Sequence, residues 1–289
     1  MSRRAFVMGG LGALLLTSCG STAGSPSGST VTLPSGSTAL VALFAATSGE
    51  PQVGFAQRLP FALADRDGSL REDVPSRLRF EVWFGDRPIG QPTDVEARGD
   101  GIDRPYYPLT FTPEQPGLHR ILAEVEGDPA EVSILVSPAL DSRLHDGDRL
   151  PRVATPTPQR PRGVVPYCTS VPACPLHEPT LRDALEGPLP LAVLVASPGT
   201  CAVSYCPPAL ELVLGAVDNH PRVRFLHAEV YADAAASGPL DRTTPVVQEL
   251  GLDFEPALFL VNADGVIRRR LDHIFDRSEL EDELNALAR

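Results

Sequence analysis

The feature that most constrains this chain is the placement of four of its five cysteines in two close pairs, Cys168/Cys174 and Cys201/Cys206. The second pair follows a continuous apolar run, residues 191–196, and precedes two prolines that open a helical pattern. Such a run is typical of a strand buried on both faces, and proline is favoured in the first turn of a helix. The second pair is therefore predicted to lie between a buried strand and a helix, where a thiol–disulfide exchange site could form.

The spacing of Cys201 and Cys206 restricts how they can pair. Residues five apart on a continuous α-helix have Cα atoms about 8 to 9 Å apart. A disulfide tolerates a Cα separation of at most about 7 Å. The two cysteines can therefore form a disulfide only if Cys201 lies in a loop before the helix. Cys206 would then lie near the helix N-terminus, where the helix dipole stabilises a thiolate.

Three interpretations of this pair remain open. It could be a structural disulfide, since most cysteine pairs of exported proteins are structural, or a disulfide that exchanges with partner proteins. It could also bind a metal together with His227 or His273. For Cys168 and Cys174 we favour a structural disulfide, with electron relay to the other pair as the alternative. Four cysteines allow three pairings, and the sequence does not choose among them.

The fifth cysteine, Cys19, ends a segment with the layout of an export signal, which we assign to residues 1–18. Arg3 and Arg4 precede an apolar stretch of about 12 residues, too short for the roughly 20 of a membrane-spanning anchor. Residues 2–7 resemble the twin-arginine export motif, and Leu16-Thr17-Ser18-Cys19 resembles the bacterial lipobox, whose cysteine is diacylated. The resemblance implies a lipoprotein anchored on the extracytoplasmic face of the cell membrane.

Composition limits the remaining choices. Residues 19–38 are almost wholly Ser, Gly, Thr, Ala and Pro, which predicts a flexible tether. The formal net charge of −12 argues against nucleic acid as a partner. With 43% apolar residues, the 289-residue chain can fill more than one core, and its length allows about two domains.

Residues 39–138 consist of short apolar or alternating runs separated by turn residues. We expect strands at residues 39–44, 58–63, 78–84, 107–111, 119–125 and 130–136. This number of strands in about 100 residues suggests an immunoglobulin-like β-sandwich. Residues 110–119 also resemble the late-strand corner of bacterial immunoglobulin-like domains. Residues 139–166 are rich in Pro, Arg and Asp and are predicted to form a linker.

Residues 167–289 alternate strand and helix patterns, which implies an α/β domain. We expect strands at residues 191–196 and 223–230, and a hairpin formed by residues 257–261 and 266–270 around an Asp-Gly turn. Helices are expected after the proline pair, at residues 244–250 and at residues 278–288.

From residue 189 to the C-terminus this order resembles the thioredoxin fold. The residues that carry the resemblance are Cys201 and Cys206 after the first central strand, Glu255-Pro256 before the hairpin, and residues 262–267. In that family the corresponding proline is cis and packs against the redox pair, a role that the resemblance implies for Pro256. The C-x4-C spacing departs from the family's C-x-x-C. Glu255 is a candidate proton acceptor, with an exposed turn residue as the alternative.

The sequence thus predicts a two-domain protein, an all-β immunoglobulin-like sandwich followed by an α/β thioredoxin-like domain. The resemblance implies a thiol–disulfide oxidoreductase acting on exported protein thiols or disulfides, with an electron donor and with neither cofactor nor metal. The alternative is a redox-inactive cell-envelope scaffold or binding lipoprotein with structural disulfides, or, as a lesser alternative, a copper-binding protein. The two differ in whether the Cys201–Cys206 bond can be reduced without unfolding.

Overall fold

The computed structural model describes residues 38–44, 51–140, 143–201, 205–234, 240 and 242–289. All of the described residues belong to one compact unit. The predicted export signal, the lipidated Cys19 and the tether up to residue 37 lie outside the described residues and stay predictions. Among the described residues, none of the helices has the length and apolar character needed to cross a bilayer.

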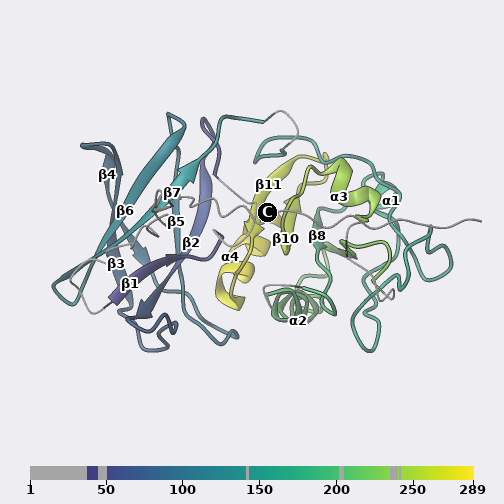
Figure 1. Cartoon of the computed structure of the whole chain (residues 1–289). Helices are drawn as coiled ribbons and strands as arrows, with labels where there is room; N and C mark the ends of the chain where they lie inside the picture. Colours follow the sequence, from purple (N-terminus) through teal and green to yellow (C-terminus); the bar gives the residue numbers. More distant parts are fainter. Residues whose placement is uncertain (1–37, 45–50, 141–142, 202–204, 235–239, 241) are drawn as a thin grey trace, which may run out of the picture. The chain divides into compact units, whose positions relative to one another are not determined.

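The first part of the described chain consists of strands in two antiparallel sheets (Figure 1). One sheet has the order β1-β2-β5 and the other the order β4-β3-β6-β7. The strands are β1 (Thr38–Ala42), β2 (Gln57–Asp65), β3 (Arg77–Phe84), β4 (Arg87–Glu96), β5 (Tyr107–Phe111), β6 (Gly117–Val125) and β7 (Asp128–Val136). Six of them lie close to the predicted strands, because their apolar residues alternate or cluster as strands require.

The two sheets bury a shared core. Phe61 and Leu63 of β2 contribute to it from one sheet, and Phe80 and Ile121 from the other. Each fully buried side chain of this size stabilises the fold by roughly 1.5–3 kcal/mol. Strand β4 was not predicted, because it is a largely exposed edge strand that buries only Val95.

The C-terminal part forms a third sheet with the order β11-β10-β8-β9. Its strands are β8 (Leu191–Val195), β9 (Arg224–Ala228), β10 (Ala257–Val261) and β11 (Ile267–Asp272). The helices are α1 (Leu181–Ala184), α2 (Cys206–Ala216), α3 (Pro245–Glu249) and α4 (Arg277–Leu287). Strands β8 and β9 are parallel, whereas β10 pairs antiparallel with both β8 and β11.

The two faces of this sheet are covered differently. Helices α2 and α4 pack on one face, where Leu194 and Leu258 meet Val213 and Leu280. The other face, which includes Phe259, is covered by the short helices α1 and α3 and by an irregular segment that contributes Leu150 and Val153.

The predicted fold class, an immunoglobulin-like sandwich followed by an α/β thioredoxin-like domain, is wrong. The described residues are mostly β, with three sheets and four helices, of which α1 has four residues and α3 five. An α/β class requires a mostly parallel sheet with helices on both faces. Here only one strand pair among the described residues is parallel, and irregular chain covers much of one face. The predicted boundaries of the sandwich, linker and C-terminal part stay predictions.

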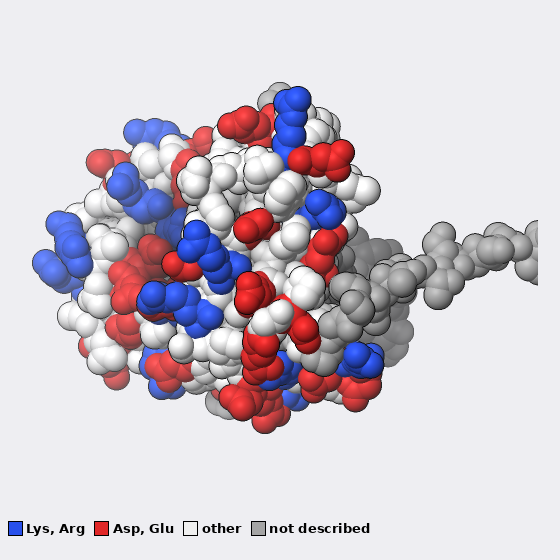
Figure 2. Space-filling view, turned by 90° about the vertical axis from the view of Figure 1, so that its left-hand side faces the viewer, with Lys and Arg blue, Asp and Glu red and all other residues white. Residues whose placement is uncertain are grey.

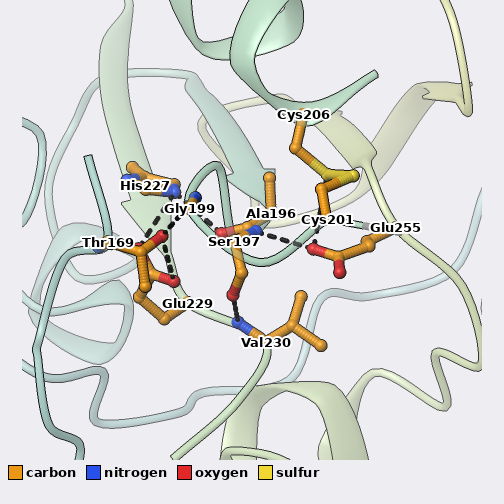
Figure 3. The surroundings of a disulfide bond; sticks show 10 residues. All are labelled: Thr169, Ala196, Ser197, Gly199, Cys201, Cys206, His227, Glu229, Val230 and Glu255. Carbon is orange, nitrogen blue, oxygen red and sulfur yellow. Dashed lines mark hydrogen bonds and ion pairs between the residues drawn. A yellow bond between two sulfur atoms is a disulfide. The ribbon is translucent and has the colours of Figure 1, made fainter. Parts of the chain in front are cut away.

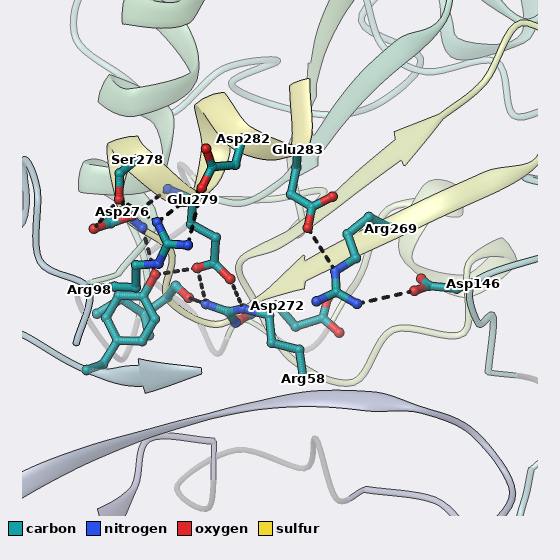
Figure 4. A network of polar contacts seen from close by, with 12 residues as sticks. Arg58, Arg98, Asp146, Arg269, Asp272, Asp276, Ser278, Glu279, Asp282 and Glu283 are labelled. Carbon is teal, nitrogen blue, oxygen red and sulfur yellow. Dashed lines mark hydrogen bonds and ion pairs between the residues drawn. The ribbon is translucent and has the colours of Figure 1, made fainter. Parts of the chain in front are cut away.

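Polar side chains join the β1-β2-β5 sheet to the C-terminal part (Figure 4). Arg58 of β2 donates to both carboxylate oxygens of Glu279 in α4, at 2.5 and 2.6 Å. Their side chains are only 2% and 8% exposed. The Tyr106 hydroxyl also donates to Glu279 and accepts the backbone N–H of Asp276. These buried contacts link the two parts of the described chain through polar side chains.

Acidic and basic side chains intermix on the face shown in Figure 2. On the β4-β3-β6-β7 sheet they include the pairs Arg77–Glu96 and Arg120–Glu131. Opposite charges in contact leave little net field to attract a polyanion.

Candidate redox site and the adjacent cysteine–histidine cluster

Cys201 and Cys206 form a disulfide, with Cα atoms 6.0 Å apart (Figure 3). Cys206 is the first residue of α2, and Cys201 precedes that helix. The sequence analysis required Cys201 to lie in a loop before the helix if the two cysteines were to pair. The structure meets this condition, because only Cys206 is helical.

The two sulfur-bearing residues differ in accessibility. Cys206, at the start of α2, is 0% exposed and packs in the hydrophobic core. Cys201 is partly exposed. Of the two cysteines, Cys201 is therefore the one that a large partner can reach.

Glu255 lies against the buried half of the disulfide. It is 6% exposed, and its Oε2 lies 3.4 Å from Cys206 Sγ and accepts the backbone N–H of Ser197 at 2.6 Å. Its Oε1 is buried without a hydrogen-bond partner among the described residues. Burial, with the negative charge of Glu229, raises the pKa of Glu255 to about 7. Glu255 is thus a buried residue rather than an exposed turn residue.

Pro256 follows Glu255 directly and is also buried, and the peptide bond between them is cis. The packing of Pro256 against the sulfurs, which the family resemblance implied, stays a prediction.

Cys168 and Cys174 are free thiols, which differs from the disulfide predicted between them. Both are buried, and their sulfurs face two imidazoles instead. Cys174 Sγ lies 3.3 Å from His177 Nε2 and 3.3 Å from His227 Nδ1, and Cys168 Sγ lies 4.0 Å from the same His227 nitrogen. We refer to Cys168, Cys174, His177 and His227 as the Cys–His cluster.

Hydrogen bonds to the backbone orient the side chains of the Cys–His cluster. His227 Nε2 lies 2.9 Å from the carbonyl oxygen of Ala196, and the backbone N–H of Cys174 donates to Cys168 Sγ at 3.4 Å. A hydrogen bond from the Cys174 thiol lowers the pKa of Cys168 despite burial, and His177 and His227 add to the effect.

One polar framework joins the cluster to the loop that precedes the disulfide (Figure 3). Thr169 donates its backbone N–H to Glu229 at 2.6 Å and accepts the N–H of Gly199 on its hydroxyl at 3.0 Å. A Cβ at Gly199 would lie 2.8 Å from the carbonyl oxygen of Thr169, so only glycine fits there without a shift. The two segments are therefore in close backbone contact.

Tyr205, the residue before Cys206, lines an apolar pocket of about 200 Å³. Its lining includes Leu43, Ile102 and Phe275. The pocket can accept an apolar side chain close to the start of α2.

No protein-family model matches the chain, and no curated protein matches it. The resemblances drawn from short motifs therefore have no support from a match over the whole chain, and the function is argued from the residues of the site.

Cys201, Cys206 and Glu255, which the sequence analysis assigned to one site, lie in contact in the structure, whereas the sequence analysis did not predict the Cys–His cluster. His227 was considered only as a metal ligand of Cys201 and Cys206, whereas its ring faces the other pair. His177 was not considered, although its position three residues after Cys174 is a spacing typical of metal ligands. The approach of His227 depends on tertiary structure and has no local signal.

Proposed function

We propose that the Cys201–Cys206 pair exchanges disulfides with exported proteins. The observation that carries this proposal is the unequal environment of the two sulfurs. Cys201 is partly exposed, whereas Cys206 is fully buried beside a carboxyl group. Exchange requires one sulfur that a partner can reach and a second that completes the reaction inside the protein.

The exchange proceeds in two displacements. A client thiolate attacks Cys201 Sγ, so that a client–Cys201 bond forms, the Cys201–Cys206 bond breaks and Cys206 leaves as a thiolate. A second client thiolate then attacks the client sulfur bound to Cys201, which forms the client disulfide and releases Cys201. Two electrons and two protons pass from the client to the pair. The reverse sequence reduces a client disulfide after an electron donor has reduced the pair.

Glu255 donates a proton to the Cys206 thiolate and accepts one from the Cys206 thiol. Its Oε2 lies 3.4 Å from Cys206 Sγ, close enough to give a proton to the leaving thiolate or to take one from the thiol. A general acid or base works best when its pKa is close to the working pH, and burial raises that of Glu255 to about 7. Since Cys206 is shielded from solvent, Glu255 is the group placed to exchange this proton.

The pocket beside Tyr205 gives the client a place to bind. Its lining is largely apolar, which suits an apolar side chain of a client segment that is not yet folded. We further propose that Cys19 is lipidated and holds the protein on the extracytoplasmic face of the membrane, where its clients are exported proteins. The motif Leu16-Thr17-Ser18-Cys19 supports this placement.

Trapping of mixed disulfides tests the proposal. The full chain with Cys206→Ser should form a covalent complex with a peptide or protein substrate that contains a disulfide. The Cys201 thiolate attacks the client disulfide, one client sulfur leaves as a thiolate, and no second sulfur of the protein is left to release the bound client. Cys201→Ser is the matched control and should trap far less, since Cys206 is buried. Circular dichroism of both variants checks folding. Equal trapping by both variants, or none by either folded variant, would contradict the proposal and favour a redox-inactive scaffold.

A further inference from the structure

We propose that Cys168, Cys174, His177 and His227 form a closed tetrahedral site for one Zn²⁺ ion. The four ligand atoms come from two places in the chain, because Cys168, Cys174 and His177 lie within ten residues and His227 follows 50 residues later. All four ligand atoms lie within 4.8 Å of one another, and all four residues are buried. The site is separate from the Cys201–Cys206 pair and does not depend on the proposed exchange reaction.

The distances fit zinc. Zinc binds thiolate sulfur at about 2.3 Å and imidazole nitrogen at about 2.0–2.1 Å, so a tetrahedral site places S and N about 3.6 Å apart. Three of the four S–N separations are 3.3, 3.3 and 4.0 Å. Each of the three differs from the tetrahedral value by about 0.3–0.4 Å, and all four ligand atoms lie within 4.8 Å of one another.

Neighbouring groups hold the side chains of the Cys–His cluster in orientations that suit metal binding. His227 Nε2 lies 2.9 Å from the Ala196 carbonyl oxygen, which holds the ring proton on Nε2 and leaves the Nδ1 lone pair facing the sulfurs. The Cys174 backbone N–H donates to Cys168 Sγ at 3.4 Å, which stabilises a thiolate there. The ring of His177 is packed edge-on against Tyr167 with centroids 5.2 Å apart, which restricts its rotation.

The charge of the occupied site selects zinc over copper. Two thiolates and two neutral imidazoles balance the two charges of Zn²⁺, so that the buried site is neutral. Cu(I), the other ion that prefers thiolates, would leave one uncompensated negative charge in the protein interior. Burying such a charge is costly, and the buried carboxyl of Glu229 lies 3.9 Å from His227 Nε2.

The site has the features of a structural zinc centre. Four protein ligands complete the tetrahedron, whereas a catalytic zinc keeps a position for water or substrate. The ion would fasten the segment that carries Cys168 and Cys174 to strand β9, which carries His227. Through Thr169 and Gly199 this segment contacts the loop before the disulfide.

Metal analysis of the full chain tests the proposal. Protein purified without chelator should contain about one zinc per chain. After chelation, titration with Co²⁺ alone should produce the absorption of tetrahedral cobalt with thiolate charge-transfer bands, and Zn²⁺ should abolish it. The melting temperature should fall on chelation and recover with Zn²⁺, since an ion that binds only the folded state stabilises it.

Variants assign the site. Cys174→Ser and His177→Ala should each lower the zinc content at least tenfold. The controls are the double variant Cys201→Ser/Cys206→Ser and His220→Ala, whose ring pairs with Glu281 outside the cluster, and both should retain zinc.

Three results would overturn the proposal. They are wild-type protein with neither zinc nor a tetrahedral Co²⁺ spectrum, copper in place of zinc, and a Cys168–Cys174 disulfide found by mass spectrometry in protein supplied with Zn²⁺. The Co²⁺ titration uses the wild-type chain, so the test stands even where a variant fails to fold. Retained zinc in a chain that traps no client would refute only the exchange reaction.

Discussion

Replacing Glu255 with glutamine should make the folded protein more stable, and by an amount that grows with pH. Glu255 is buried and its pKa is raised from the ordinary 4.5 to about 7, chiefly by burial. The folded protein therefore binds the Glu255 proton more tightly than the unfolded chain does. The free energy of unfolding falls as the pH rises from about 4.5 to about 7, and the loss is constant above that range.

The size of the change in unfolding free energy follows from the rise in the pKa of Glu255. One pKa unit corresponds to 1.36 kcal/mol, so a rise of about 2.5 units amounts to about 3 kcal/mol. Glutamine resembles the protonated carboxyl group and can still accept the N–H of Ser197 on its amide oxygen. The difference in unfolding free energy, Glu255→Gln minus wild type, should thus increase by about 3 kcal/mol between pH 4.5 and pH 8.

Urea unfolding of the oxidised full chain, followed by circular dichroism at several pH values, measures this difference. The matched control is Glu114→Gln, because Glu114 is exposed. If the difference in unfolding free energy between Glu255→Gln and wild type does not change with pH, the reasoning is refuted. Burial of the ionised Glu255 carboxylate would then cost no free energy. The variant should also slow disulfide exchange, because no carboxyl group remains to exchange a proton with Cys206.

Further predictions concern stability and anchoring. Arg58→Ala should lower the free energy of unfolding by about 3–5 kcal/mol, because it leaves the buried carboxylate of Glu279 without its cation. Arg77→Ala, which removes an exposed ion pair, should lower it by less than about 1 kcal/mol. Urea unfolding measures both. Gly199→Ala should destabilise the folded protein by about 1–3 kcal/mol, because the added Cβ clashes with the backbone of Thr169. Gly215→Ala is the control. It should not destabilise the protein in the same assay, because Gly215 lies on a helix with open space around it. Cys19→Ala should move the protein from the membrane to the soluble fraction on fractionation, and a variant that stays membrane-bound would argue against lipidation.

The sequence predicted most strands and helices because their apolar residues follow local periods. The apolar run at residues 191–196 became β8, and the proline pair does mark the first turn of α2. Strand β4 was missed because its side chains are mostly exposed and show no alternation. The fold class was wrong because element order does not determine how much of a sheet face helices cover, or whether neighbouring strands run parallel.

The surroundings of the Cys201–Cys206 disulfide were predictable in part for the same reason. Cys201, Cys206 and Glu255 lie close to elements that the sequence locates well, and the Cα limit of a disulfide fixed which cysteine precedes the helix. The contact of Arg58 with Glu279 joins residues 221 apart in the chain, and no local pattern announces it. The Cys–His cluster depends in the same way on the packing of a proline-rich loop against β9.

The measurement that tests the central claim most directly is the redox equilibrium of Cys201 and Cys206 in the folded full chain. The protein is equilibrated with a series of thiol redox buffers, and mass spectrometry identifies the paired cysteines at each potential while circular dichroism reports folding. An exchange site predicts that the bond opens between about −120 and −270 mV in a chain that stays folded. A bond that resists reduction below about −300 mV, or that opens only when the chain unfolds, would contradict the account.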